Sequence, residues 1–311
     1  MSRSINVLSS CQLLGYTRQA YYKVPRGILN KDANVVEPIL QTIIKARKAN
    51  PTKGCRAVYE QQGQRWPIGR DKSIALMMDF GYRVKYPKSY KKATQAGNRE
   101  FANLLVNKEV TGINQVWQAD MAYYLYGDER FYTMYITDVY SQEVVGYGAF
   151  RYNFAANYSQ VLSKAIRKQK KHTINLHLLI HHSDGGKQYE SSDYKNLCKR
   201  HGIKQSMCLY SYENPYAEKT NDLINNGYLN KWKPKSLIAL RQMQELAVKD
   251  HNVNSWKRIL GKRSPLEFKN QLLNNPNGDM IYHLMLKPVN PAQPKNKLLQ
   301  LNNNVISLNN N

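Results

Sequence analysis

Residues 176–221 read LHLLIHHSDGGKQYESSDYKNLCKRHGIKQSMCLYSYENPYAEKTN. The apolar runs, caps and glycines of this stretch predict two strand–helix pairs in succession. In order, these are a strand at Leu176–Ile180, a helix from Ser191 or Ser192 to just before Gly202, a strand at Ile203–Cys208, and a helix that opens with Asn214 as N-cap and Pro215 as first helical residue. The pattern is typical of an open α/β sheet, in which sites form where strands end.

Two carboxylates of this stretch fall where such a site forms. Asp184 follows the first strand, and Glu218 lies in the first turn of the last helix. A third carboxylate, Asp120, lies upstream in Val116–Met121, within a β-rich region that continues to Phe150. Carboxylates placed together resist ionising unless a cation neutralises them, and their hard oxygens suit Mg²⁺ or Mn²⁺. Two such ions can clamp the attacking and leaving oxygens of a phosphoryl displacement.

Five sequence words in order carry a resemblance to a known family. They are Trp117-x-x-Asp120, Tyr135-Ile136-Thr137-Asp138-Val139-Tyr140-Ser141-x-x-Val144-Val145-Gly146, His182-Ser183-Asp184-x-Gly186-x-Gln188-Tyr189, His201-Gly202-Ile203-x-x-Ser206-Met207 and Asn214-x-x-Ala217-Glu218-x-x-Asn221. With these words the chain resembles the OrfB-type transposases of the IS-three group of bacterial insertion sequences, which carry a retroviral-integrase-like Asp-Asp-Glu core. The resemblance implies a ribonuclease-H-like α/β fold, with an integrase-type mixed sheet flanked by helices and preceded by small all-helical domains.

The same resemblance implies a chemistry and a set of partners. Asp120, Asp184 and Glu218 are expected to be the catalytic residues and the ligands of Mg²⁺ or Mn²⁺, with two ions in each active site. The expected activity is DNA transposition, in which a donor DNA end is cleaved and joined to a target. The expected partners are both DNAs, further copies of the chain, and an OrfA-type protein from an upstream reading frame. Asp138 is expected to have a structural role, His182 to orient the loop after its strand, and Asn214 to cap its helix.

The composition agrees with a nucleic-acid partner. The chain has 46 basic and 22 acidic residues in 311, a formal net charge of +24. A field of that sign attracts polyanions, although a ribosome-associated or merely basic protein has the same composition. The four cysteines show no paired ligand spacing, which argues against a disulfide framework or a zinc site. No apolar run approaches the ~20 residues that span a bilayer, so we expect a bacterial cytoplasmic, nucleoid-associated protein.

The chain order predicts five segments. They are a helix-turn-helix-like segment at 1–27 (alternatively a helical hairpin that only packs), a three-helix domain at 30–82, a basic linker at 83–113, an integrase-like catalytic core with its C-terminal helices at 114–270, and a disordered Asn-rich tail at 271–311. The residues expected to contact DNA are Arg18, Gln19, Lys187, Gln188, Tyr189, Lys219 and Asn225.

Two departures from the family pattern keep other functions open. Between Asp184 and Glu218 lie 33 residues, slightly fewer than is usual in the family. Asn225 occupies a position where the family commonly has a DNA-facing Lys. One alternative is therefore a domesticated or catalytically impaired DNA-binding protein of the same fold. Another is a structure-specific nuclease that hydrolyses DNA without joining it.

Overall fold

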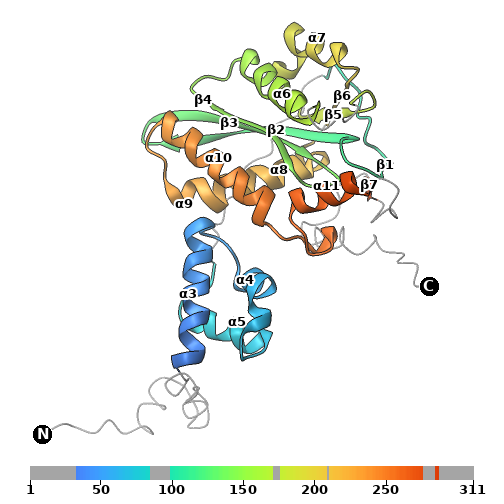
Figure 1. Ribbon diagram of the computed structural model, residues 1–311. Helices are drawn as coiled ribbons and strands as arrows, with labels where there is room; N and C mark the ends of the chain where they lie inside the picture. Colours follow the sequence, from blue (N-terminus) through green and yellow to red (C-terminus); the bar gives the residue numbers. More distant parts are fainter. Residues whose placement is uncertain (1–32, 85–98, 171–175, 209, 276–283, 287–311) are drawn as a thin grey trace, which may run out of the picture. The chain divides into compact units, whose positions relative to one another are not determined.

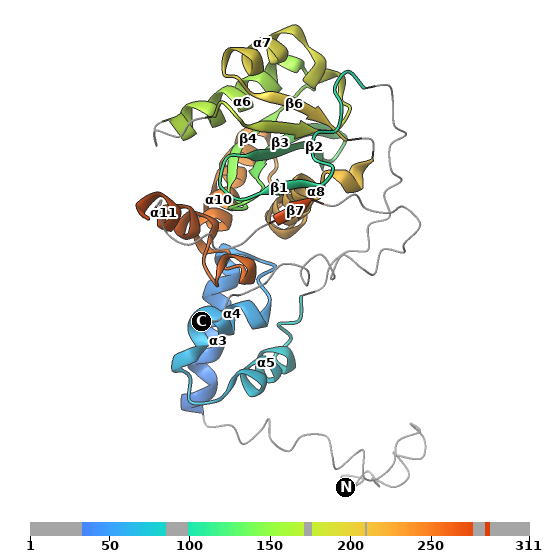
Figure 2. The ribbon, with the colours of Figure 1, turned by 90° about the vertical axis from the view of Figure 1, so that its right-hand side faces the viewer.

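The computed structural model describes residues 33–84, 99–170, 176–208, 210–275 and 284–286 (Figures 1 and 2). The chain divides into two units, Met1–Lys85 and Tyr86–Asn311, which are considered separately. The helix-turn-helix-like segment predicted at 1–27, with Arg18 and Gln19, lies outside the described residues. Among the helices that the structure describes, none combines the length and hydropathy needed to cross a lipid bilayer.

The described part of the first unit is helical. Its helices are α3 (Ala33–Ala49), α4 (Cys55–Gln62), the 3₁₀ turn η1 (Gly63–Arg65) and α5 (Arg70–Asp79). They lie where the apolar spacing predicts them, and Asn50-Pro51 follows the end of α3. Ile39 and Ile43 of α3 are fully buried against Val58, Leu76 and Met77, which forms a small separate core.

The second unit is built on a five-stranded mixed sheet. Its strands are β2 (Val116–Tyr126), β3 (Glu129–Asp138), β4 (Val144–Phe150), β5 (Ile180–Ser183) and β6 (Lys204–Met207), in the order β4-β3-β2-β5-β6. The first three strands form an antiparallel meander, whereas β5 and β6 run parallel to β2. This is the ribonuclease-H-like arrangement that the sequence resemblance implies.

Helices cover both faces of the sheet (Figure 1). On one face lie α6 (Ala155–Lys170), the 3₁₀ turn η2 (Lys187–Glu190) and α7 (Ser192–Arg200), with Ser191 as N-cap of α7. The other face carries η3 (Ser211–Glu213), α8 (Pro215–Asn221), the π-helix η4 (Asp222–Leu229), α9 (Asn230–Trp232), α10 (Leu237–Asn254), η5 (Arg258–Leu260) and α11 (Pro265–Asn274). Trp117 and Ala119 of β2 pack toward α6, while Tyr135 of β3 packs toward α10.

Three segments of the second unit differ from the structure that the sequence predicts for them. Strand β1 (Lys108–Val110) pairs antiparallel with β7 (Leu284–Leu286), so a piece of the predicted linker and a piece of the predicted tail form a two-stranded sheet. Val110 and Leu284 are buried in a common apolar cluster, which explains why both segments are ordered. The strand expected at Leu176–Ile180 is also displaced, because β5 begins at Ile180 and includes the two histidines.

A buried ion cluster ties α6 and α11 to the connection between β3 and β4. Glu143 is 1% exposed and accepts hydrogen bonds from Lys168 at 2.9 Å and from Lys269 at 3.0 Å. Lys269 is 2% exposed and also donates to Gln169 at 2.7 Å. Burial opposes the ionisation of Glu143, but the two lysines together hold the pKa of its carboxyl below the ordinary value. Each buried charge in this cluster therefore depends on its partners.

Candidate active site

The sheet brings Asp120 and Asp184 together. Strands β2 and β5 are parallel, and their last aligned pair is Ala119 opposite Ser183. The next residue on each strand is one of the two aspartates. Because neighbouring strands lie about 4.8 Å apart, the two carboxyl groups start from adjacent backbone positions.

Helix α8 is attached directly to β2 beside these aspartates. The Asn214 side-chain amide donates to the Ala119 carbonyl oxygen at 2.9 Å, and the Tyr216 N–H donates to the Gln118 side-chain oxygen at 2.9 Å. Glu218 lies in the first turn of this helix. The structure confirms Asn214 as the N-cap residue by position, but its side chain makes no capping hydrogen bond. Its amide nitrogen is turned toward the Ala119 carbonyl oxygen, and its amide oxygen has no partner among the described residues.

The carboxyl group of Asp120 is held at both oxygens. The Met121 N–H donates to Oδ1 at 2.8 Å, and the Asn221 amide donates to Oδ2 at 2.7 Å. Burial, the nearby Asp184 and, more weakly, Glu218 raise the pKa of Asp120 to about 7 despite these hydrogen bonds. Burial likewise raises the pKa of Asp184. The carboxylates therefore act as one electrostatic cluster in which full ionisation is costly.

The donor set of this cluster fits a hard divalent cation. Carboxylate oxygens suit Mg²⁺ and Mn²⁺, and a cation would remove the repulsion that raises the pKa of Asp120. Within the described ranges, no three His, Cys, Asp or Glu side chains converge closely enough to hold an ion in the conformations present. The Glu218 side chain is exposed, so closing the cage around an ion calls for this side chain to rotate at the surface.

Asn221 and Gln118 are site residues to which the sequence analysis assigned no role. Asn221 holds the carboxyl group of Asp120 in place, and Gln118 holds the start of α8. The available signal for Asn221 was its position three residues after Glu218, which puts the two side chains on one helix face. For Gln118, the signal was its two-residue spacing from Asp120 in a strand, which puts both side chains on the same face of the sheet.

Some of the residues predicted to contact DNA lie at the surface, and others are buried in the core. Lys187 is exposed and paired with Glu190 at 3.0 Å, and Gln188 is half-buried beside it. Tyr189, however, is only 1% exposed and packs edge-on against Tyr158. The structure contradicts a DNA contact for Tyr189, because its ring belongs to the core between η2 and α6.

Asn225 is also in the core. It is 8% exposed, accepts a hydrogen bond from the Tyr135 hydroxyl at 2.9 Å and donates to the Thr133 hydroxyl at 3.3 Å. The prediction of a DNA contact assumed that the α-helix continues, so that Asn225 lies two turns along the Glu218 face. The chain instead forms the π-helix η4 from Asp222, which takes more residues per turn and moves Asn225 toward the sheet.

The histidines of β5 are buried and neutral. His182 shares a hydrogen bond with the Ser206 hydroxyl of β6 at 2.8 Å, and His181 shares one with the Tyr194 hydroxyl of α7. Burial lowers the pKa of His181 to about 3 and that of His182 to about 4. The contact of His182 holds β5 against β6 two residues before Asp184, so the predicted loop-orienting role remains compatible with its position.

A third buried histidine, His251 of α10, gives a testable pH dependence. Burial lowers its pKa to about 3, while an imidazole in the unfolded chain titrates near 6.5. As the pH falls below 6.5, the unfolded chain binds a proton that the folded chain does not, so stability is lost toward acid. Between pH 6.5 and 5, the unfolding free energy of the wild type falls. For His251→Gln, this fall is expected to be smaller by about 2 kcal/mol.

Urea unfolding at a series of pH values measures this difference. The variant comparison isolates His251, because Asp120 and Asp138, with pKa values raised chiefly by burial to about 7 and about 6, act in the opposite direction in both proteins. The exposed Gln242 of the same helix supplies the control, because Gln242→Ala neither adds nor removes a titrating group and should leave the pH slope unchanged. Identical slopes for His251→Gln and the wild type would contradict a neutral buried imidazole.

The sheet order and the paired aspartates define a protein of the ribonuclease-H-like class. Residues 111–210 match the family model of the integrase core domain. The chain is 26% identical over 272 residues to the insertion element IS600 uncharacterized 31 kDa protein of Shigella sonnei, covering 83% of this chain and 97% of that one. It is 24% identical over 228 residues to transposase InsF for insertion sequence IS3fB of Escherichia coli, covering 70% and 76%. The chain therefore carries an integrase core domain and is similar to transposases of bacterial insertion sequences.

Among solved structures, the chain gives a match to a retroviral integrase. The HTLV-2 integrase catalytic core domain matches with a TM-score of 0.39 and 18% sequence identity, covering 54% of this chain and 99% of that one.

Proposed function

We propose that this protein catalyses DNA transposition by cleaving a donor DNA end and joining it to a target, with Asp120, Asp184 and Glu218 as catalytic residues. One observation carries the proposal: β2 and β5 place two aspartates at neighbouring positions, and hydrogen bonds from α8 to β2 hold the Glu218 helix beside them. The integrase core domain and the relatives named as transposases support the same reaction.

In this proposal the three carboxylates hold Mg²⁺ or Mn²⁺, two ions in each site. When bound, the cations would stabilise the charge that develops on the attacking and leaving oxygens of the phosphodiester. The Met121 N–H and the Asn221 amide keep the Asp120 carboxyl in one orientation. The attachment of α8 to β2 keeps Glu218 on a rigid element, and such positioning is a large part of catalysis in phosphoryl transfer.

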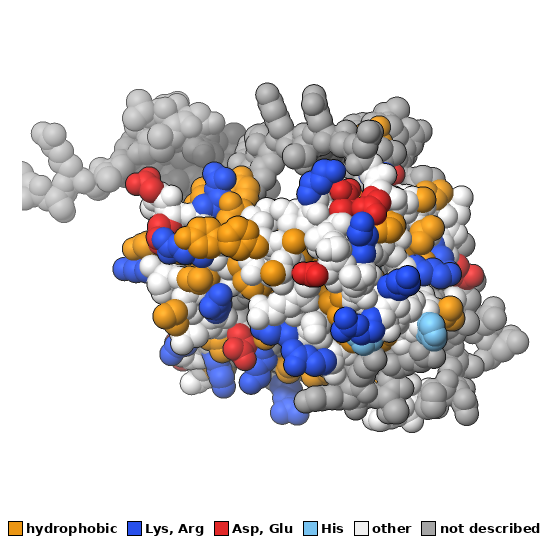
Figure 3. All heavy atoms as spheres, turned by 90° about the horizontal axis from the view of Figure 1, so that it is seen from above, with side chains coloured by type: hydrophobic (Ala, Val, Ile, Leu, Met, Phe, Trp, Pro, Cys, Tyr) orange, Lys and Arg blue, Asp and Glu red, His pale blue; other side chains and the backbone are white. Residues whose placement is uncertain are grey.

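The proposed substrates are element-end DNA and target DNA, met in the bacterial cytoplasm at the nucleoid. Lys and Arg side chains spread over the face that α6 and α7 form (Figure 3), including the exposed Lys164, Arg167, Lys199 and Arg200. A field of this sign attracts DNA and makes binding salt-dependent. We further propose that several copies assemble on DNA and that an OrfA-type partner recognises the element ends.

The test is strand transfer with purified full-length protein. The substrates are an end-containing oligonucleotide and a plasmid target, with Mg²⁺, Mn²⁺ or a chelator. Wild-type protein is expected to join the strands only with the metal, and Glu218→Gln is expected to join none while still binding DNA. The exposed Glu245 of α10 supplies the matched control, so Glu245→Gln should join like the wild type. Calorimetric titration with Mn²⁺ gives a second readout, in which Glu218→Gln binds more weakly.

Each other outcome identifies an alternative. Cleavage without joining indicates a structure-specific nuclease. DNA binding that is independent of metal, without cleavage even after the upstream-frame protein is added, indicates a DNA-binding protein that has lost turnover. Joining that survives in Glu218→Gln removes Glu218 from the catalytic set.

A further inference from the structure

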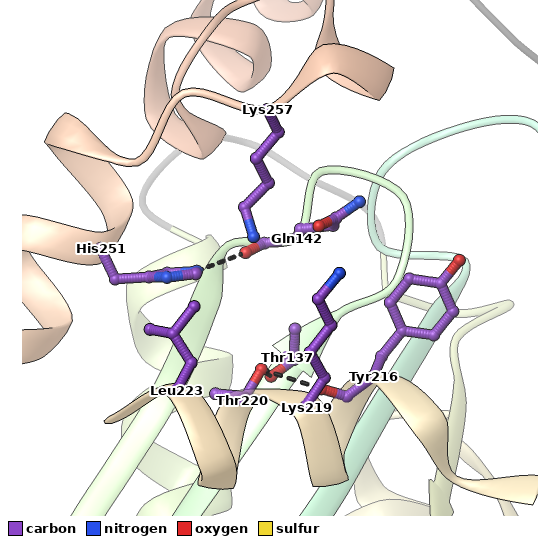
Figure 4. Close-up of a pocket in the computed structure, with 8 residues that line it drawn as sticks. All are labelled: Thr137, Gln142, Tyr216, Lys219, Thr220, Leu223, His251 and Lys257. Carbon is purple, nitrogen blue, oxygen red and sulfur yellow. Dashed lines mark hydrogen bonds between the residues drawn. The ribbon is translucent and has the colours of Figure 1, made fainter. Parts of the chain in front are cut away.

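A pocket lies between the catalytic helix α8 and the connection that follows β3 (Figure 4). Its walls come from α8 and η4, the connection between β3 and β4, the last turn of α10 and the segment that follows α10. The residues that matter for its chemistry are Gln142, Tyr216, Lys219, Thr220, His251 and Lys257.

Two lysines point into this pocket from opposite walls. Lys219 reaches in from α8, and Lys257 reaches in from the segment after α10 (Figure 4). Within the described part of the chain, neither ammonium group has a hydrogen-bond or ion-pair partner. Burial, and then the charge of Lys219, lower the pKa of Lys257 to about 7. Two cations that share one pocket in this way create a site for an anion.

The other walls supply no compensating negative charge. No acidic side chain is among the residues that line the pocket. The His251 Nε2–H donates to the Gln142 carbonyl oxygen at 3.1 Å, and burial keeps this imidazole neutral by lowering its pKa to about 3. The Thr220 hydroxyl accepts from Thr137 and donates to the Tyr216 carbonyl oxygen, so it is already satisfied. The net charge of the lining is therefore positive.

We propose that this pocket binds a phosphate group of the DNA backbone between Lys219 and Lys257. The proposal rests on the proposed function, because Lys219 directly follows Glu218 and a strand bound at the carboxylates must continue past α8. Backbone phosphates recur about every 3.4 Å of axis along each strand, so a strand that runs past α8 would bring a phosphate to the pocket. The pocket would thereby fix the position of the DNA strand relative to the catalytic helix.

The first test is the salt dependence of DNA binding, measured by fluorescence anisotropy with the end-containing duplex. The double variant Lys219→Gln/Lys257→Gln is expected to bind about tenfold more weakly at 0.1 M salt, with the slope of log K against log salt reduced by about 1. The matched control is Lys235→Gln/Lys249→Gln, two exposed lysines that lie before and within α10 and do not line the pocket. Lys257→Arg, which keeps the charge, should retain the wild-type slope.

The second test uses wild-type protein and needs no variant to fold. The rate of acetylation of Lys257 is followed by peptide mass spectrometry, alone, with the duplex, and with inorganic phosphate. Protection by micromolar duplex but not by millimolar phosphate supports the proposal. Equal protection by free phosphate assigns the pocket to a small anion and overturns it.

The outcomes separate this proposal from the proposed function. An unchanged salt slope in the double variant, or a loss as large in the control pair, overturns the phosphate site even if the wild type joins strands. Failure of the wild type to cleave or join, with the partner protein present, overturns the proposed function whatever the slope shows.

Discussion

The substitution Asp120→Asn is expected to lower the rate of strand joining by at least about a thousandfold while it stabilises the metal-free protein. The loss of rate follows because an amide is a poor ligand for the cations. The gain in stability follows because burial, Asp184 and Glu218 raise the pKa of Asp120 to about 7, which makes its ionised form costly at pH 8. We expect the melting temperature at pH 8, with a chelator, to rise by about 5 °C.

The surroundings of Asp120 can accommodate the amide. The Asn221 side-chain oxygen has no partner among the described residues, so this amide can turn over and accept a hydrogen bond from the new side chain. Asp128→Asn, in the exposed turn between β2 and β3, is the matched control and should change neither rate nor melting temperature. A variant that joins at more than a tenth of the wild-type rate would remove Asp120 from catalysis. A lower melting temperature would contradict the explanation that burial and the nearby carboxylates make the ionised form of Asp120 costly.

The substitution Lys269→Met is expected to lower the unfolding free energy by about 3–5 kcal/mol. It leaves the Glu143 carboxylate buried with only Lys168 to compensate it, and it removes the hydrogen bond to Gln169. Urea unfolding of the full chain, followed by circular dichroism, measures the loss.

Lys168→Met provides the comparison on the same carboxylate. The Lys168 side chain is 46% exposed, so its ion pair is screened by water and its removal should cost less than about 1 kcal/mol. Equal losses for the two variants would show that burial does not decide the strength of these pairs. A loss below 1 kcal/mol for Lys269→Met would contradict the dependence of Glu143 on its buried partner.

The sequence predicted most of the second unit because local signals and tertiary packing agree there. The helix after Ser191 begins at that cap, and the helix α8 begins at Pro215, as the sequence indicates. The closeness of Asp120 and Asp184 in space could not be predicted from local sequence patterns, because 63 residues lie between them. The resemblance implied that they meet, and the parallel register of β2 and β5 explains how.

The errors arose where tertiary contacts override local patterns. The histidines of β5 looked like loop residues because they are polar, but hydrogen bonds to Ser206 and Tyr194 satisfy them inside the core. Asn225 was placed by α-helical spacing, which fails across the π-helix η4. Strand β7 is three residues long and pairs with a strand far away in the sequence, so no local pattern could indicate it.

The pairing of β1 with β7 brings together two segments of the second unit that are far apart in the sequence. Lys108 and Leu286 are direct cross-strand partners, so backbone from the early part of the unit lies beside backbone from its late part (Figure 2). Neighbouring ends of this kind allow a domain to be circularly permuted. A short linker could join the two ends, and new termini could be opened at the exposed turn around Gly127 without interrupting the carboxylate site. A protein fused before β1 and a protein fused after β7 would therefore be attached at neighbouring positions on the second unit.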